Sequence, residues 1–147
     1  MISSEHLQDF VKDTEEIIRY IFSKNHYNSS RAKWPAFEPK NSEVSVFRTD
    51  GVNELEKIEI GKWVESERNK GKEVIQTLKA WVEFKAIDVR NLEYPDLNKM
   101  KLDIIYEPKT HTHHSNIKDL SKTNNEDWLE EAKILATKLN MNLKKIG

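Results

Sequence analysis

Residues 78–86 carry the pattern that most constrains the fold of this chain. Leu, Ala, Val, Phe and Ala alternate there with Lys, Trp, Glu and Lys, and successive side chains of a strand point to opposite faces of a sheet. Val74, Ile75, Leu78 and Val82 would also fit one face of a helix. Residues 43–48 alternate too, and residues 102–106 form a short apolar run before Pro108. These segments predict a β-sheet.

Helical spacing recurs in three other parts of the chain. Residues 4–22 carry apolar side chains at helical intervals behind a Ser3 or Ser4 cap, which predicts an N-terminal helix. Asn53 can cap a middle helix that is interrupted or ends near Gly61, and residues 86–92 can turn helical. The final helix is marked by an apolar stripe behind a cap at Asn124 or Asn125, and its members are Trp128, Ala132, Leu135 and Leu139.

This order of elements predicts an α+β fold. We expect one compact domain over residues 1–147, with a mixed or antiparallel sheet of about four or five strands and N-terminal, middle and C-terminal helices. Residues 31–37 should be extended, because Pro35 disfavours the helical conformation at Trp34. The N-terminal helix, within residues 1–22, is expected to be peripheral and to pack on the sheet or on a second copy of the chain, as in a homodimer.

The amino-acid composition indicates the cellular compartment that we expect for the protein. Cysteine is absent, which fits a reducing compartment. The first twenty residues are rich in acids, unlike a targeting peptide, and no apolar run approaches the ~18 residues of a membrane span. We therefore expect a cytoplasmic protein without membrane contact. The net charge is −1 with 33% charged residues, so phosphate recognition would need a local basic patch.

Two short motifs resemble a known family. Residues 45–51 read Ser-Val-Phe-Arg-Thr-Asp-Gly, and residues 114–117 read His-Ser-Asn-Ile. Together with Ile60-Gly61, they resemble a family of small uncharacterised prokaryotic proteins that share an SxFRTDG strand-turn and a C-terminal HxNI segment. The resemblance covers about residue 31 to the C-terminus. It implies no activity, but it draws attention to Arg48, His114 and Asn116, and we associate it with prokaryotic defence.

Three of the five histidines lie within four residues, and this cluster allows three interpretations. In an extended segment, His111 and His113 share one face and could bind a metal, while His114 faces the other way. Alternatively, His113 and His114 act as general acid and base beside a phosphate neutralised by Arg48 and oriented by Asn116, and no cofactor is required. The third interpretation is a solvated polar loop without chemistry.

Aromatic and basic residues also occur together. Such platforms hold nucleotides and single-stranded nucleic acids, although tryptophans more often fill cores. The candidate ligand-binding residues of this kind are Arg31, Lys33, Trp34 and Lys85. Walker, dinucleotide and nucleophile-elbow motifs are absent, which argues against nucleoside triphosphate hydrolysis and ordinary serine hydrolase chemistry.

The hypothesis that follows is a protein that binds a nucleotide or RNA-type phosphodiester, and that acts as a metal-independent nuclease or phosphodiesterase through Arg48 and residues 111–116. In such chemistry the ribose 2′-hydroxyl attacks its own phosphate. Two alternatives belong to other classes: a non-catalytic interaction or regulatory module, and a small metal-dependent hydrolase that uses His111 and His113.

Overall fold

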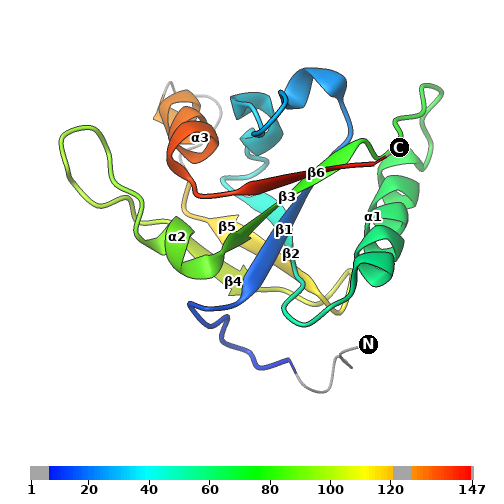
Figure 1. Ribbon diagram of the computed structural model, residues 1–147, viewed down its shortest axis with the longest axis horizontal. Coiled ribbons are helices and arrows are strands. Elements are labelled where there is room, and N and C mark those ends of the chain that lie inside the picture. Colours follow the sequence, from blue (N-terminus) through cyan, green and yellow to red (C-terminus); the bar gives the residue numbers. More distant parts are fainter. Residues whose placement is uncertain (1–6, 121–126, 147) are drawn as a thin grey trace.

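The computed structural model describes residues 7–120 and 127–146 of the chain. Strands and helices alternate irregularly along it (Figure 1). Two short 3₁₀ helices, η2 and η3, precede the second strand. The elements in chain order are β1 (Glu16–Ile21), η2 (Lys24–His26), η3 (Trp34–Phe37), β2 (Val44–Arg48), α1 (Glu54–Asn69), β3 (Ala80–Lys85), α2 (Ala86–Arg90), β4 (Asp103–Tyr106), β5 (His114–Lys118), α3 (Asp127–Lys138) and β6 (Asn142–Lys145).

In the described residues, six strands form one sheet in the order β4-β5-β2-β1-β3-β6. Every neighbouring pair in this order is antiparallel. With three α-helices around it, the sheet makes a compact α+β domain, as the order of sequence patterns predicts. The sheet has more strands than predicted because the N-terminal segment contributes β1 to its centre.

The two faces of the sheet carry separate hydrophobic clusters. Val44 and Val46 of β2 belong to the larger cluster, which includes apolar side chains of α2 and α3. Phe47 points to the opposite face and belongs to a smaller cluster, against which Trp63 of α1 packs. Helices therefore cover both faces, with α1 on the face of Phe47 (Figure 1).

The N-terminal segment is a strand where a helix is predicted. β1 pairs with β3 over six residues and lies between β2 and β3. Ile17 and Ile18 are both fully buried although they point to opposite faces. A central strand that is covered on both faces reads as a continuous apolar run, which periodicity alone does not separate from a buried helix. The predicted Ser3 or Ser4 cap lies outside the described residues.

Several local predictions have clear outcomes. Asn53 does cap α1, since its side chain accepts a hydrogen bond from the Glu56 amide at 2.9 Å. The helix does not end near Gly61 but continues to Asn69. The predicted extended segment 31–37 instead contains η3, in which Pro35 takes a position in the first turn, where a missing amide hydrogen costs little. Asn124 and Asn125 lie outside the described residues.

No helix in residues 7–120 or 127–146 combines the length and the apolar character needed to cross a membrane.

The second half of the chain otherwise follows its sequence patterns. The predicted strands at 78–86 and 102–106 correspond to β3 and β4, and the predicted turn to helix after residue 86 corresponds to α2. The closing strand expected near Met141 and Ile146 is β6.

Candidate functional site

Arg48 does not share a cleft with His114, contrary to the sequence hypothesis. Phe47 and His114 are directly paired between β2 and β5, so they lie on the same face of the sheet, and Arg48 points to the other face. There its guanidinium donates two hydrogen bonds to Glu15, from Nε at 2.8 Å and from Nη2 at 2.9 Å. Its exposed fraction is 2%. Arg48 is thus a buried structural cation and is not available to a phosphate.

The three clustered histidines divide between two sites. His111 and His113 line a small hollow of about 200 Å³ beside Glu56 and Glu59 of α1. Their ring centroids are 5.4 Å apart, and burial lowers the pKa of each ring. In the part of the chain that the structure describes, no three His, Cys, Asp or Glu side chains converge to hold a metal ion. His111 and His113 share one hollow as predicted, but residues 112–113 form a turn and not an extended segment. His114 does not face away from His111, because both rings pack against Phe47, with centroid distances of 5.4 Å and 5.7 Å.

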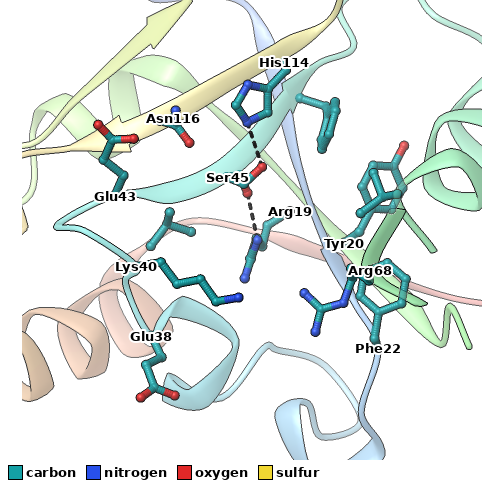
Figure 2. Close-up of a pocket in the computed structure, with 13 residues that line it drawn as sticks. Arg19, Tyr20, Phe22, Glu38, Lys40, Glu43, Ser45, Arg68, His114 and Asn116 are labelled. Atoms are coloured by element: carbon teal, nitrogen blue, oxygen red, sulfur yellow. Dashed lines mark hydrogen bonds between the residues drawn. The ribbon is translucent and has the colours of Figure 1, made fainter. Parts of the chain in front are cut away.

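His114 and Asn116 line a larger cavity of about 400 Å³ on the face of the sheet that carries α1 (Figure 2). Both residues belong to β5, where they alternate with buried Ser115. His114 Nε2 lies 2.9 Å from Ser45 Oγ on β2. The Asn116 amide nitrogen donates to the Glu107 carboxylate at 2.7 Å. His114 and Asn116 therefore lie in a strand that forms a cavity wall, whereas residues 112–113 before them form a turn.

Arg19 enters this cavity where two strands separate. The β1–β2 ladder covers only Ile17↔Arg48 and Ile18↔Phe47. Beyond that point the Ser45 carbonyl accepts a hydrogen bond from Arg19 Nη1 at 2.9 Å, and Arg19 Nε donates to the Ala36 carbonyl at 2.9 Å. The side chain thus replaces missing strand pairing, and its guanidinium points into the cavity (Figure 2).

Arg68, near the C-terminal end of α1, supplies a second guanidinium to the same cavity. Its guanidinium carbon lies 4.6 Å from the centre of the Phe22 ring, and Nη2 donates to the Gln76 side chain at 3.0 Å. Its buried Nε has no hydrogen-bond partner in the described chain. A buried N–H without a partner is costly and marks a place where a ligand acceptor could bind.

The electrostatics of the cavity are dominated by these two arginines. Neither Arg19 nor Arg68 forms an ion pair with any described residue. Burial, together with the charge of Arg68, lowers the pKa of Arg19 to about 10, and burial also lowers the pKa of Arg68. Both groups remain charged at neutral pH. Lys40 adds a third cation at the exposed rim, where the neighbouring carboxylates are Glu38 and Glu43.

The predicted aromatic and basic residues lie elsewhere. Arg31, Lys33 and Trp34 line a second cavity of about 490 Å³ between η3 and α3. The Arg31 guanidinium is occupied by the Ala136 carbonyl at 2.9 Å and by the Leu139 carbonyl, so it caps the C-terminal end of α3. Trp34 remains 37% exposed.

Lys85 is exposed at the end of β3 and its amine donates to the Thr14 carbonyl at 3.3 Å. It lines neither of these two cavities. The four predicted ligand-binding residues of this group therefore do not form one surface.

Sequence reasoning missed Arg19 and Arg68 because neither belongs to a motif. Arg19 interrupts the apolar run of β1, and Arg68 follows a mixed charged stretch of α1. The signal that could have pointed to Arg19 was its place inside a strand that is otherwise apolar, where a charged side chain needs a specific partner.

Comparison of the chain with protein-family models, with curated proteins and with solved structures gives no match. The resemblance of residues 45–51 and 114–117 to a prokaryotic family stays a hypothesis.

Proposed function

We propose that the protein binds a nucleotide or a short RNA-type phosphodiester in the cavity formed by β1, β2, β5 and α1. The observation that carries this proposal is the pair of guanidiniums, Arg19 and Arg68, which line the cavity without a carboxylate partner among the described residues. Guanidinium groups bind phosphate oxygens through strong charge-assisted hydrogen bonds. In this proposal the two arginines take the role that the sequence suggested for Arg48.

The size and lining of the cavity support a ligand of this class. About 400 Å³ lies within the range of sites that hold small molecules. Tyr20, Phe22 and Phe47 supply aromatic surface, and the Arg68 guanidinium stacks on one of these rings. Planar guanidinium and aromatic groups are the surfaces on which nucleobases stack. A phosphate between Arg19 and Arg68, with its base on the aromatic surface, would use both features.

The binding experiment compares two variants that remove one positive charge from neighbouring positions. Arg68→Gln removes a cavity cation, whereas Lys70→Gln removes an exposed one that pairs with Glu67. We expect Arg68→Gln to weaken binding of a 5′-nucleotide by about 10- to 100-fold, since a hydrogen bond to a charged group contributes about 1.5–3 kcal/mol. Lys70→Gln should bind like the wild type. Calorimetry that detects no nucleotide binding, or equal loss in both variants, would contradict the proposal.

We further propose that the bound phosphodiester is cleaved without a metal, with His114 as the proton-transferring group. The imidazole lines the same cavity as Arg19 and Arg68. General acid–base catalysis by a positioned side chain contributes about 10²–10⁴-fold. Oligonucleotide cleavage should therefore persist in excess chelator and fall by about that factor in His114→Gln. Activity that disappears with chelator would favour the metal-dependent alternative.

A non-catalytic interaction module is the rival proposal, and one observation favours it. Val74 and Ile75, in the segment after α1, are 80% and 59% exposed. Neighbouring exposed apolar side chains are a common feature of protein contact surfaces. A protein that binds no nucleotide, but loses a protein partner on Val74→Ser, would support this rival.

A further inference from the structure

Ser45 and His114 have the geometry of an activated nucleophile. The His114 Nδ1 atom lies 2.8 Å from the backbone carbonyl of Glu107. A carbonyl oxygen only accepts hydrogen bonds, so Nδ1 carries the proton and Nε2 presents its lone pair. The Ser45 hydroxyl, 2.9 Å from Nε2, therefore donates to the imidazole. A nucleophile, a base and a group that orients the base are thus in contact in this order.

Regular structure holds these groups in place. Ser45 pairs with Asn116 across the β2–β5 ladder, and His114 pairs with Phe47, so the dyad is a diagonal contact on one sheet face. The Glu107 amide donates to the His114 carbonyl at 3.0 Å. Because β2 and β5 hold Ser45 and His114, and a backbone hydrogen bond holds Glu107 against His114, the dyad is preorganised.

A guanidinium contacts the backbone of Ser45. Arg19 Nη1 donates to the backbone carbonyl of Ser45 at 2.9 Å, which places a guanidinium beside the residue that would attack. Arg68 lines the same cavity. Preorganised donors near a reacting centre stabilise the charge that develops in the transition state. The cavity therefore combines a nucleophile with groups that could stabilise a phosphoryl transition state.

We infer that Ser45 is the nucleophile of a covalent phosphodiesterase reaction and that His114 is its base. This inference rests on the proposed function for its substrate class, a phosphodiester, but not for the dyad itself. In the first step the Ser45 Oγ–phosphorus bond forms and the bond from phosphorus to the leaving oxygen breaks. The hydroxyl proton passes to His114 Nε2 and then to the leaving oxygen, which departs as an alcohol.

In the second step water attacks the phosphorus of this Ser45 phosphodiester intermediate, which still carries the other ester group of the substrate, and gives a proton to His114 Nε2. The phosphorus–Oγ bond breaks, the proton returns to Oγ, and a phosphate monoester leaves. Water is the only co-reactant. Since Ser45 supplies the attacking oxygen, a linkage that lacks the ribose 2′-hydroxyl should also be cleaved. Cleavage of such a linkage would distinguish attack by Ser45 from direct attack by the ribose 2′-hydroxyl.

The first test uses a fluorophosphonate, a neutral probe that phosphonylates activated serines. Intact mass spectrometry should detect one adduct, and peptide mapping should place it on Ser45. Ser45→Ala should show no adduct, and His114→Gln should react at least about 100-fold more slowly. Ser66→Ala, an exposed position on α1, should be labelled like the wild type. Thermal melts of all variants separate loss of the dyad from loss of the fold. An unlabelled wild type, or an adduct elsewhere, would overturn the inference.

The second test compares oligonucleotides with ribose and deoxyribose linkages. The dyad predicts cleavage of both, with a nucleotide joined through its phosphate to Ser45 and trapped by acid quench. Cleavage of ribose linkages alone, with a cyclic 2′,3′-phosphate product, would overturn it. The two proposals fail separately. Ser45 labelling without nucleotide binding would refute the proposed ligand and support the dyad, whereas nucleotide binding without Ser45 labelling would refute the dyad alone.

Discussion

The assignment of Arg48 as a structural cation predicts a large stability loss on Glu15→Gln. The two side chains make a two-point ion pair, with exposed fractions of 2% for the arginine side chain and 9% for the glutamate side chain. Glu15 also accepts the Lys12 amide at 2.7 Å. Glutamine has nearly the same shape, but its NH₂ group would face the guanidinium. The substitution therefore leaves a buried positive charge without a counter-ion.

Removal of one partner from a buried pair costs about 3–5 kcal/mol, because the remaining charge is desolvated and uncompensated. For a chain of this length, each kcal/mol corresponds to roughly 2–4 °C in Tm, so we expect a drop of roughly 6–20 °C. Glu54→Gln is the matched control. It breaks a pair with Lys144 whose side chains are 59% and 54% exposed, and it should cost at most about 0.5 kcal/mol.

Urea unfolding monitored by circular dichroism measures these differences. The double variant Glu15→Leu with Arg48→Met should be more stable than either single variant, because it removes both charges together. If Glu15→Gln unfolds like the wild type while Arg48→Met loses nucleotide binding, the structural assignment of Arg48 is refuted and the original phosphate hypothesis returns.

Helix packing, acid stability and cavity charge each give a further measurable outcome. Gly61→Ala should lower the unfolding free energy by about 1–2 kcal/mol. The added Cβ would lie 2.6 Å from Leu78 Cδ2 and 2.8 Å from Tyr20 Cε1, which is too close for either contact. An unchanged urea midpoint would contradict this prediction. Burial lowers the pKa of three histidines, namely His26, His111 and His113. The unfolded chain then binds more protons than the folded one, so the unfolding free energy should fall as pH drops below about 6.5, and a flat urea series would count against it. The positive charges of Arg19 and Arg68 also lower the pKa of His26. A phosphate bound between these arginines should therefore raise the His26 pKa in an NMR titration, and an unchanged His26 pKa would argue against an anion in the cavity.

Much of the fold was predictable where local signals agree. β2 and β3 alternate clearly, and α1 has a capping asparagine at its start. β1 was not predictable, because Ile17 and Ile18 are buried on opposite faces and acids precede them in the way they precede a helix. Its identity depends on pairing with β3, whose partner residues lie 59 to 69 positions away. Local patterns contain no such tertiary information.

The candidate site was half predictable for a related reason. Alternation along a strand was expected to separate His114 from His113, and the two do line different cavities, although residues 112–113 form a turn. The same alternation places Arg48 away from His114 once the register of β2 and β5 is known, but a shift of one residue would reverse the result. Register depends on the whole sheet. Sequence reasoning therefore identified His114, which lines the cavity, but it chose Arg48 in place of Arg19 and Arg68.

The five arginines differ in the partners that their guanidinium groups have within the described chain. Arg48 and Arg90 pair with carboxylates, and Arg31 caps a helix end. Arg19 and Arg68 instead face a cavity without a carboxylate partner in the described chain, an arrangement that reduces folding stability and is typical of binding sites.

This contrast gives a direct comparison of two identical substitutions. Arg48→Met leaves Glu15 as an unpaired buried anion and should cost about 3–5 kcal/mol. Arg68→Met strands no carboxylate, and methionine can keep the packing against Phe22, so the free protein should stay within about 1 kcal/mol of wild-type stability while nucleotide binding is lost. If urea unfolding shows equal destabilisation by the two substitutions, Arg68 is a structural residue as well. The proposal that the cavity binds a phosphate would then be refuted.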